Sequence, residues 1–368
     1  MRKISIQKQR RNKKADEAAS SMQFTLNETA FQNRRTILKQ SLPVAAGAAA
    51  FLQGNQLEAG LQITKLAGIA HFDLATVGLA LGMKPFWVKP SKVLLLKSKW
   101  TTLEFEVEGR DFLLNKRKIY LGHPVRLYKN RPYITEKDYL LTIRPILAPQ
   151  TLKNKPPVQR IVLDPGHGGK DFGAQNTSSK LKEKDLTLDV TLRLQRILAK
   201  QGFQVFLTRK DDKYIPLDQR GELAARVKAD LFLSIHFNSV GRPNVSGLET
   251  FVLPQPWTPS TSRSKLEGID KLTYPGNSSD GWNSLAGFYV HRALIDQLGV
   301  EDRGLKRSRF KVLKNLTCPG MLVELGFISH PQTASRLKQS AHREMLAKTL
   351  LTGIQTYKKT QLRLGGQT

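Results

Sequence analysis

The chain has 368 residues, with 59 lysines and arginines against 30 aspartates and glutamates, which gives a formal net charge of +29 at pH 7. This length is enough for two or three domains with buried cores. The positive charge favours a polyanionic partner, such as nucleic acid, an anionic membrane or an acidic cell-surface polymer. The sequence has neither zinc-finger spacing nor the aromatic motif of RNA-recognition domains, so we predict no nucleic-acid partner. The only cysteine, Cys318, excludes an intramolecular disulfide.

Residues 1–59 are predicted to be a disordered basic leader followed by an export signal. The leader is polar and rich in Lys and Arg, a composition that does not bury a core. Arg34 and Arg35 then precede a short apolar run at 41–52, and this order resembles a twin-arginine signal, with Ile37 where the pattern usually has Phe. A run this short does not span a bilayer, so we expect no permanent transmembrane helix. The prediction is a periplasmic or cell-envelope protein exported by the twin-arginine route; the alternative is a cytosolic protein with an alanine-rich helix.

Residues 60–148 are predicted to form a small β-rich module. A helical pattern at 72–82 is followed by several segments with the alternation of strands, and a short helix is expected at 139–147. No catalytic grouping is visible in this module. Residues 149–158, rich in proline and polar side chains, are predicted to be the linker to the next domain.

Residues 159–360 show alternating strand and helix patterns and are predicted to form the second domain, and residues 361–368 are predicted to be a tail. Strands are expected at 160–164, 204–209, 230–236, 247–253 and 321–324. Helices are expected at 183–202, 217–227, 284–298 and 334–357. This alternation predicts an α/β domain with a largely parallel sheet and helices on both faces.

Side chains suited to metal binding follow these elements where they end or begin. His167 lies in a Pro-Gly-His-Gly-Gly turn after the first strand, His236 and Glu324 end two later strands, and Glu183 begins a helix. Because open α/β sheets bind ligands at the carboxyl ends of their strands, we expect these side chains to converge. Two imidazoles and one carboxylate form a common catalytic zinc set. A second carboxylate would then serve as general base and acid.

Each of these residues alone has a simpler interpretation. His167 could lie idle in a surface turn, and His236 could be a buried imidazole with its hydrogen bonds satisfied. Glu183 could be a helix N-terminal charge, stabilised by roughly 0.3–1 kcal/mol. Glu324 is harder to explain in this way, because a carboxylate at the end of an apolar strand is costly to bury without a partner. Their joint occurrence favours a metal site.

Residues 160–356 also resemble the zinc-dependent N-acetylmuramoyl-L-alanine amidases of the amidase-3 type. The matching segments, in family order, are Val162–Gly169, Glu183–Leu186, Thr208–Arg209, Ser234–Asn238, Asp302–Leu305 and Leu322–Ser329. Two positions depart from the family pattern, because Ala225 and His330 stand where the family usually has Asn. The resemblance implies an α/β fold with a three-layer sandwich around a mixed, largely parallel sheet, here preceded by the small β-rich module.

The resemblance implies a peptidoglycan hydrolase that cleaves the amide between N-acetylmuramic acid and L-alanine of the stem peptide. His167, Glu183 and His236 would hold Zn²⁺, which would polarise the scissile carbonyl and lower the pKa of a bound water toward about 7. Glu324 would take the proton of that water and pass it to the leaving amine. The excess of positive charge suits an anionic wall polymer as partner.

Several alternatives stay open at this point. Asn238 and Arg309 are expected to contact substrate, but Arg309 could equally belong to an ordinary basic face. The aromatic-bearing region 254–283 is of the kind that binds or covers substrate when it lies beside a site. Control by a protein activator or recruiter is left open. Two other functions fit the residues: a zinc peptidase that cuts elsewhere in the stem peptide, and a non-catalytic basic module that binds the wall.

Overall fold

The computed structural model describes residues 60–153 and 155–366 of the chain, so the predicted leader and export signal lie outside the described residues. Among the helices that are described, none combines the length and the apolar character needed to cross a bilayer.

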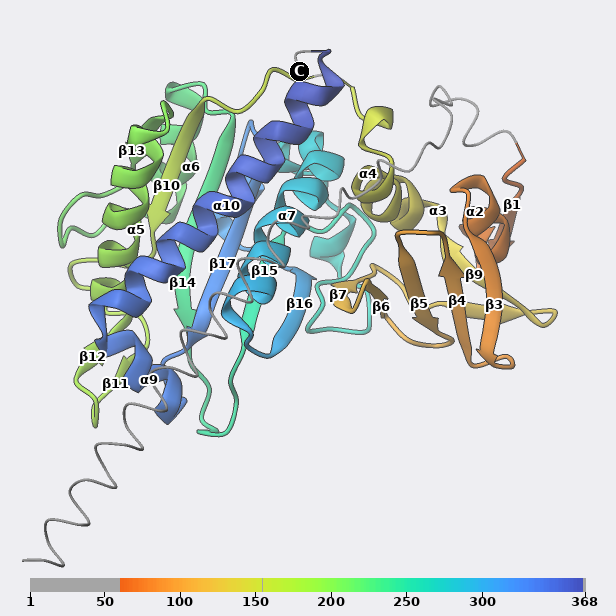
Figure 1. The fold of residues 1–368 in the computed structure, drawn as a ribbon, viewed down its shortest axis with the longest axis horizontal. Coiled ribbons are helices and arrows are strands. Elements are labelled where there is room, and N and C mark those ends of the chain that lie inside the picture. The colour runs from red at the N-terminus through yellow and green to blue at the C-terminus, as the bar shows by residue number, and fades with distance from the viewer. Residues whose placement is uncertain (1–59, 154, 367–368) are drawn as a thin grey trace, which may run out of the picture. The chain divides into compact units, whose positions relative to one another are not determined.

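One sheet of eleven strands forms the framework (Figure 1). Across the sheet, the strands are β13 (Gln204–Leu207), β10 (Arg160–Pro165), β14 (Leu231–Asn238), β17 (Gly320–Phe327), β15 (Leu248–Val252), β16 (Asp302–Arg307), β7 (Arg117–Tyr120), β6 (Asp111–Leu114), β5 (Thr102–Glu106), β4 (Val93–Lys97) and β3 (Lys84–Lys89). Strands β13, β10, β14 and β17 are parallel, whereas β15 runs antiparallel to β17 and parallel to β16. The sheet is therefore mixed, and the carboxyl ends of four strands meet at one edge.

Helices cover both faces of the part of the sheet that contains β10, β14 and β17. The helices on one face are α5 (Glu183–Lys200), α7 (Asp280–Leu298) and α10 (Ser340–Leu364), and those on the other are α6 (Leu217–Arg226) and α8 (Lys311–Lys314). Successive residues of the strands divide between the two faces: Leu163 and Leu233 join the core under α5 and α7, while Val162 and Phe232 join the core under α6 and α8. The predicted three-layer α/β sandwich is confirmed.

Helix α5 illustrates how the sequence positions the site. Its apolar residues Leu186, Val190 and Leu194 recur at helical spacing and are buried against the sheet. Its first turn carries Glu183 and Asp185, acidic residues that the helix dipole favours at this end. Burial of the apolar stripe therefore fixes where the Glu183 side chain lies.

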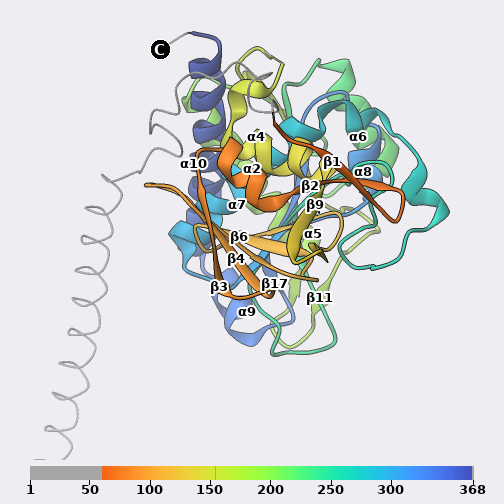
Figure 2. The same ribbon diagram turned by 90° about the vertical axis from the view of Figure 1, so that its right-hand side faces the viewer.

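The N-terminal module contains a second sheet of four strands and contributes the last five strands of the large sheet (Figure 2). The small sheet consists of β1 (Ile63–Leu66), β2 (Ile69–Asp73), β9 (Arg131–Thr135) and β8 (Arg126–Tyr128), and α2 (Leu74–Ala80) follows β2. Strands β8 and β9 are joined by a hairpin turn at Lys129 and Asn130, and both residues have positive φ, as a type I′ turn needs. Short helices follow: α3 (Glu136–Asp138), the π-helix η1 (Tyr139–Ile143), α4 (Arg144–Leu147) and the 3-10 helix η2 (Pro149–Thr151).

Strand β7 of the module pairs in parallel with β16, so that Ile119 lies beside Leu305. The predicted boundaries at 60–148, 149–158 and 159–360 thus divide a chain whose two parts share one sheet. These boundaries stay predictions. The remaining elements are β11 (Gln175–Asn176), β12 (Leu181–Lys182), η3 (Gly268–Lys271), η4 (Pro275–Ser279) and α9 (Pro331–Lys338).

The region 254–283 does not begin beside the carboxyl ends of β10, β14 and β17. It follows β15, which runs antiparallel to β17, and therefore leaves the sheet at the opposite edge. There the module holds it, because Arg110 donates hydrogen bonds to the backbone oxygens of Pro259 and Ser260, and Lys137 Nζ lies 2.8 Å from the Pro256 oxygen.

Candidate metal centre

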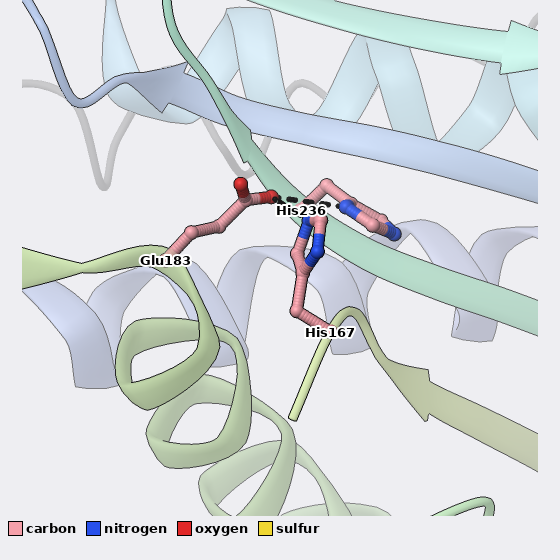
Figure 3. A group of neighbouring side chains, drawn as sticks. All are labelled: His167, Glu183 and His236. Atoms are coloured by element: carbon pink, nitrogen blue, oxygen red, sulfur yellow. Dashed lines mark hydrogen bonds and ion pairs between the residues drawn. The ribbon is translucent and has the colours of Figure 1, made fainter. Parts of the chain in front are cut away.

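His167, Glu183 and His236 form a compact cluster (Figure 3), in which one ligand atom of each residue lies within 4.8 Å of the others. Glu183 Oε1 is 3.1 Å from His167 Nε2 and 2.9 Å from His236 Nδ1. The two imidazole rings meet edge to face, with their centroids 5.0 Å apart. Two nitrogen donors and one carboxylate oxygen therefore surround one point, and the cluster can hold a metal ion.

Parallel pairing of β10 with β14 brings the two histidines together. Pro165 lies beside Ile235 in this register, and each histidine follows shortly after along its own strand direction. The Gly166 amide donates to the Ile235 oxygen at 3.0 Å, which extends the pairing to the start of the His167 turn. The sequence-based expectation that these strand ends converge is therefore met by the geometry.

The backbone of the His167 turn leaves the site clear of side chains. His167 has a φ of +61°, a left-handed conformation that is uncommon for a residue with a side chain. A Cβ at Gly166 would collide with the His236 ring, and a Cβ at Gly173 would lie 2.6 Å from Glu183 Oε2. Glycine at these two positions therefore makes room for the cluster itself.

Two buried arginines hold this turn in place. Arg220 and Asp164 form a fully buried ion pair with a distance of 2.8 Å, and Arg220 also donates to the His167 oxygen at 2.9 Å. Arg209 donates to the oxygens of Pro165 and Gly166 at 3.0 and 2.8 Å. A buried guanidinium is tolerated when its charge is paired or its N–H groups are hydrogen-bonded; Arg220 has the Asp164 carboxylate, and Arg209 donates to backbone oxygens and to Thr187. Sequence reasoning noted Arg209 only as part of a family motif and missed Arg220.

Asp171 orients His167 and was also missed. Its Oδ2 lies 2.8 Å from His167 Nδ1, which directs Nε2 toward the cluster. A carboxylate behind a metal-binding histidine fixes the tautomer and orientation of the ring. The spacing of four residues from His167 was the available signal in the sequence.

Electrostatics within the cluster favour an ionised Glu183. Burial opposes ionisation, but hydrogen bonds with His167 and His236 hold the pKa of Glu183 well below its usual range. The Phe237 amide also donates to Glu183 Oε1 at 3.0 Å. Burial disfavours the charged form of His167, but Glu183 and Asp171 nevertheless raise its pKa. Because metal binding needs neutral imidazoles, an ion bound at the cluster would displace the proton that His167 Nε2 carries whenever the ring is charged.

Glu324 lies on β17, opposite His236 of β14 on one side and Glu249 of β15 on the other. Its Oε2 atom is buried and has no hydrogen-bond partner among the described residues. Burial, together with the charges of Glu183 and Glu249, raises the pKa of Glu324 well above its ordinary value. A strongly shifted carboxyl group beside metal-type donors is a candidate for proton transfer.

Of the two expected substrate contacts, the structure brings only Asn238 to this edge of the sheet. Asn238 ends β14, and its Nδ2 lies 2.8 Å from Glu249 Oε2. Arg309 follows β16, which ends at the opposite edge, and its guanidinium binds Asp270 at 2.6 Å with 4% of the side chain exposed. The structure does not place Arg309 near the cluster, and we leave it out of the candidate site. Glu249 was missed, although a carboxylate within an apolar strand is the same signal that drew attention to Glu324.

A metal-binding cluster with an adjacent carboxyl group, at the edge of a sheet covered by helices, is typical of metal-dependent hydrolases. The family model described as N-acetylmuramoyl-L-alanine amidase matches residues 161–356, which is more than half of the chain. The chain therefore belongs to the N-acetylmuramoyl-L-alanine amidase family.

Similar proteins include a protein named probable cell wall amidase LytH from Staphylococcus aureus, which is 34% identical over 216 residues. That match covers 58% of this chain and 63% of the relative, so the chain spans less than two thirds of the relative's length. Among solved structures, the amidase AmiC2 of Nostoc punctiforme is 31% identical, with a TM-score of 0.45, over 55% of this chain and 97% of that one. The catalytic domain of CwlV from Bacillus (Paenibacillus) polymyxa var. colistinus is 28% identical, with a TM-score of 0.46, over 54% and 97%.

Proposed function

We propose that the chain is a zinc-dependent peptidoglycan hydrolase that cleaves the amide between N-acetylmuramic acid and L-alanine of the stem peptide. The observation that carries this proposal is the convergence of His167, Glu183 and His236 beside the unpartnered Glu324 carboxyl group in a member of an amidase family. Membership of the family supports the identity of the scissile bond, and the cluster supports a metal-dependent mechanism.

The donor set fits zinc. Two imidazoles and one carboxylate with a fourth position left for water or substrate are a recurrent catalytic zinc set, and the glycines of the turn keep side chains out of the cluster. Zinc bound there would polarise the scissile carbonyl and acidify the attacking water. Asp171 holds the His167 ring in the orientation that this binding needs.

Glu324 is proposed as the general base and acid. Burial raises the pKa of Glu324, so its carboxylate is a stronger base than an ordinary one, which suits a group that accepts a proton from water and returns it to the leaving amine. Its unpartnered oxygen is free of competing hydrogen bonds from the described residues. Asn238, at the same edge, is proposed as a substrate contact.

Replacing Glu324 by Gln tests the proposal. Zinc content should persist while hydrolysis of purified sacculi falls by about 10²-fold or more, since general base catalysis contributes that much. The matched control is Glu106→Gln, because Glu106 is an exposed glutamate of the module with 61% of its side chain accessible. Mass spectrometry of the products should find stem peptides that begin at L-alanine; fragments cut elsewhere in the stem peptide would instead support the peptidase alternative. Hydrolysis that survives in Glu324→Gln would remove Glu324 from its role.

The proposed substrate places the protein in the cell envelope, with the anionic wall polymer as its partner. The names of its cell wall relatives support this location. The twin-arginine route remains a proposal from residues 34–35, and its test is the double replacement Arg34→Lys with Arg35→Lys. The variant should accumulate inside the cell, and undiminished export would rule the route out. A protein activator stays a prediction.

A further inference from the structure

Two aromatic rings are exposed next to the candidate metal centre. Phe172 is 41% exposed and Tyr214 is 39% exposed. Phe172 stands in the chain between Asp171, which is hydrogen-bonded to His167, and Gly173, where a Cβ would lie 2.6 Å from the His167 ring. Both sequence neighbours of Phe172 therefore lie against the cluster.

Tyr214 approaches the same turn from another segment. It lies beyond β13, which is parallel to β10, so its loop leaves the sheet at the same edge as the His167 turn. A Cβ at Gly169 would lie 2.8 Å from the Tyr214 nitrogen and 3.1 Å from its Cβ, so the two backbones are in close contact. The turn that carries His167 is thus flanked by the two segments that carry these rings.

Lysines hold both rings. Lys184 and Lys182 place their Nζ atoms 4.5 and 5.0 Å from the centre of the Phe172 ring, and Lys170 lies 5.1 Å from the centre of the Tyr214 ring. Lys184 Nζ also donates to the Gly169 oxygen at 2.9 Å, so the lysine over Phe172 is tied to the glycine that Tyr214 contacts. Cation–π contacts restrain rings that remain exposed.

We propose that Phe172 and Tyr214 form a saccharide subsite, which binds the amino sugar that carries the scissile amide. This inference rests on the proposed function. The amide carbonyl is joined to the sugar through a lactyl group, so the sugar must lie within a few bonds of the reacting atoms. A pyranose has a broad apolar C–H face that matches an aromatic ring, whereas the L-alanine on the other side of the bond is too small to cover two rings. Exposed apolar side chains that gather beside a site commonly mark the surface that a ligand covers.

The test compares two substrates that share the scissile amide. One is N-acetylmuramoyl pentapeptide, and the other is the same pentapeptide carrying an N-lactyl group without the sugar. Phe172→Ala and Tyr214→Ala should each raise KM about two- to tenfold for the first substrate and leave KM for the second unchanged. Little change in kcat is expected, because the sugar contact is made equally in the ground and transition states.

The module offers a matched control in Trp100, an aromatic residue that is 41% exposed with Lys99 Nζ 4.7 Å from its ring. Trp100→Ala should change KM for neither substrate, and Phe172→Trp should restore the wild-type value. Equal rises in KM for both substrates, or no rise for either, would overturn the saccharide subsite while the proposed function stands.

A binding measurement separates failure of the subsite from failure of the proposed function. If the wild-type protein cleaves neither substrate, the proposed function fails. Calorimetric titration with a peptide-free glycan tetrasaccharide then still decides the subsite. Binding to the wild type that is lost in the double variant Phe172→Ala with Tyr214→Ala supports it, and equal binding or absence of binding to the wild type overturns it.

Discussion

Glu324 pairs with His236 across neighbouring parallel strands, and its Oε2 atom is buried without a hydrogen-bond partner among the described residues. An unsatisfied buried oxygen is costly in a folded protein and is retained where a ligand or a reaction uses it. Because paired residues of neighbouring strands point to the same face of the sheet, the Glu324 carboxyl group lies on the same face as His236 of the metal-binding cluster. The remaining residues of the site serve to keep this geometry.

We expect the zinc affinity of the cluster to depend on Asp171. Replacing Asp171 by Asn removes the carboxylate that lies 2.8 Å from His167 Nδ1, and we expect zinc affinity to fall about 10- to 100-fold. Competition titration against a zinc-binding dye measures this directly, and excess zinc should restore most of the activity. Asp218→Asn is the control, because Asp218 forms an exposed pair with Lys311. Unchanged zinc affinity in Asp171→Asn would show that the carboxylate does not orient the ring.

We expect the stability of the folded protein to depend on Arg220. Arg220→Ala leaves Asp164 charged and fully buried, and loss of one partner of a buried ion pair costs about 3–5 kcal/mol in the free energy of unfolding. Denaturant unfolding monitored by circular dichroism gives the difference. Arg292→Ala is the control, because its pair with Asp296 is partly exposed and should contribute less than about 1 kcal/mol. A loss in Arg220→Ala no larger than that of the control would contradict the anchoring role of the pair.

Asp280 should make stability depend on pH. Burial raises the pKa of Asp280 to about 7, above the value of 3.8 expected in the unfolded chain, so the folded state binds more protons between these values. Its contribution to stability is present below about pH 4 and is lost as pH rises through about 7, by up to about 4 kcal/mol. Asp280→Asn should therefore be more stable than the wild type at pH 8 by more than it is at pH 4. Thermal unfolding at both pH values checks this, and a difference that does not change with pH would disprove it.

The sequence predicted the residues of the cluster because each stands in a local pattern. His167 and His236 follow apolar strand segments, and Glu183 begins an amphipathic helix, so parallel strands and helix packing suffice to bring them to one edge. Glu324 was predicted for the same reason. These inferences need only the direction of each element, which the alternation of strand and helix supplies.

Features that depend on pairing between segments distant in the chain could not be predicted from local sequence patterns. The antiparallel pairing of β15 with β17 decides that the region 254–283 and Arg309 lie at the far edge, and no local pattern reports the direction of a strand. Arg220 lies on α6 among polar residues, and only its partner Asp164, distant in sequence, explains its burial. The pairing of β7 with β16 is of this kind too, because it joins segments that composition treats as separate domains.

The pairing of β7 with β16 predicts that the module and the catalytic region do not fold independently. Removing residues 1–148, and the module with them, would expose the edge of β16 and uncover Leu305, which is 1% exposed beside the fully buried Ile119. Exposed strand edges and apolar surface promote association, so we expect the fragment 149–368 to aggregate in size-exclusion chromatography. The control keeps both parts: a protease site inserted after Lys153 and then cleaved should give two pieces that elute together. A monomeric fragment with the thermal midpoint of the whole chain would show instead that the two parts fold separately.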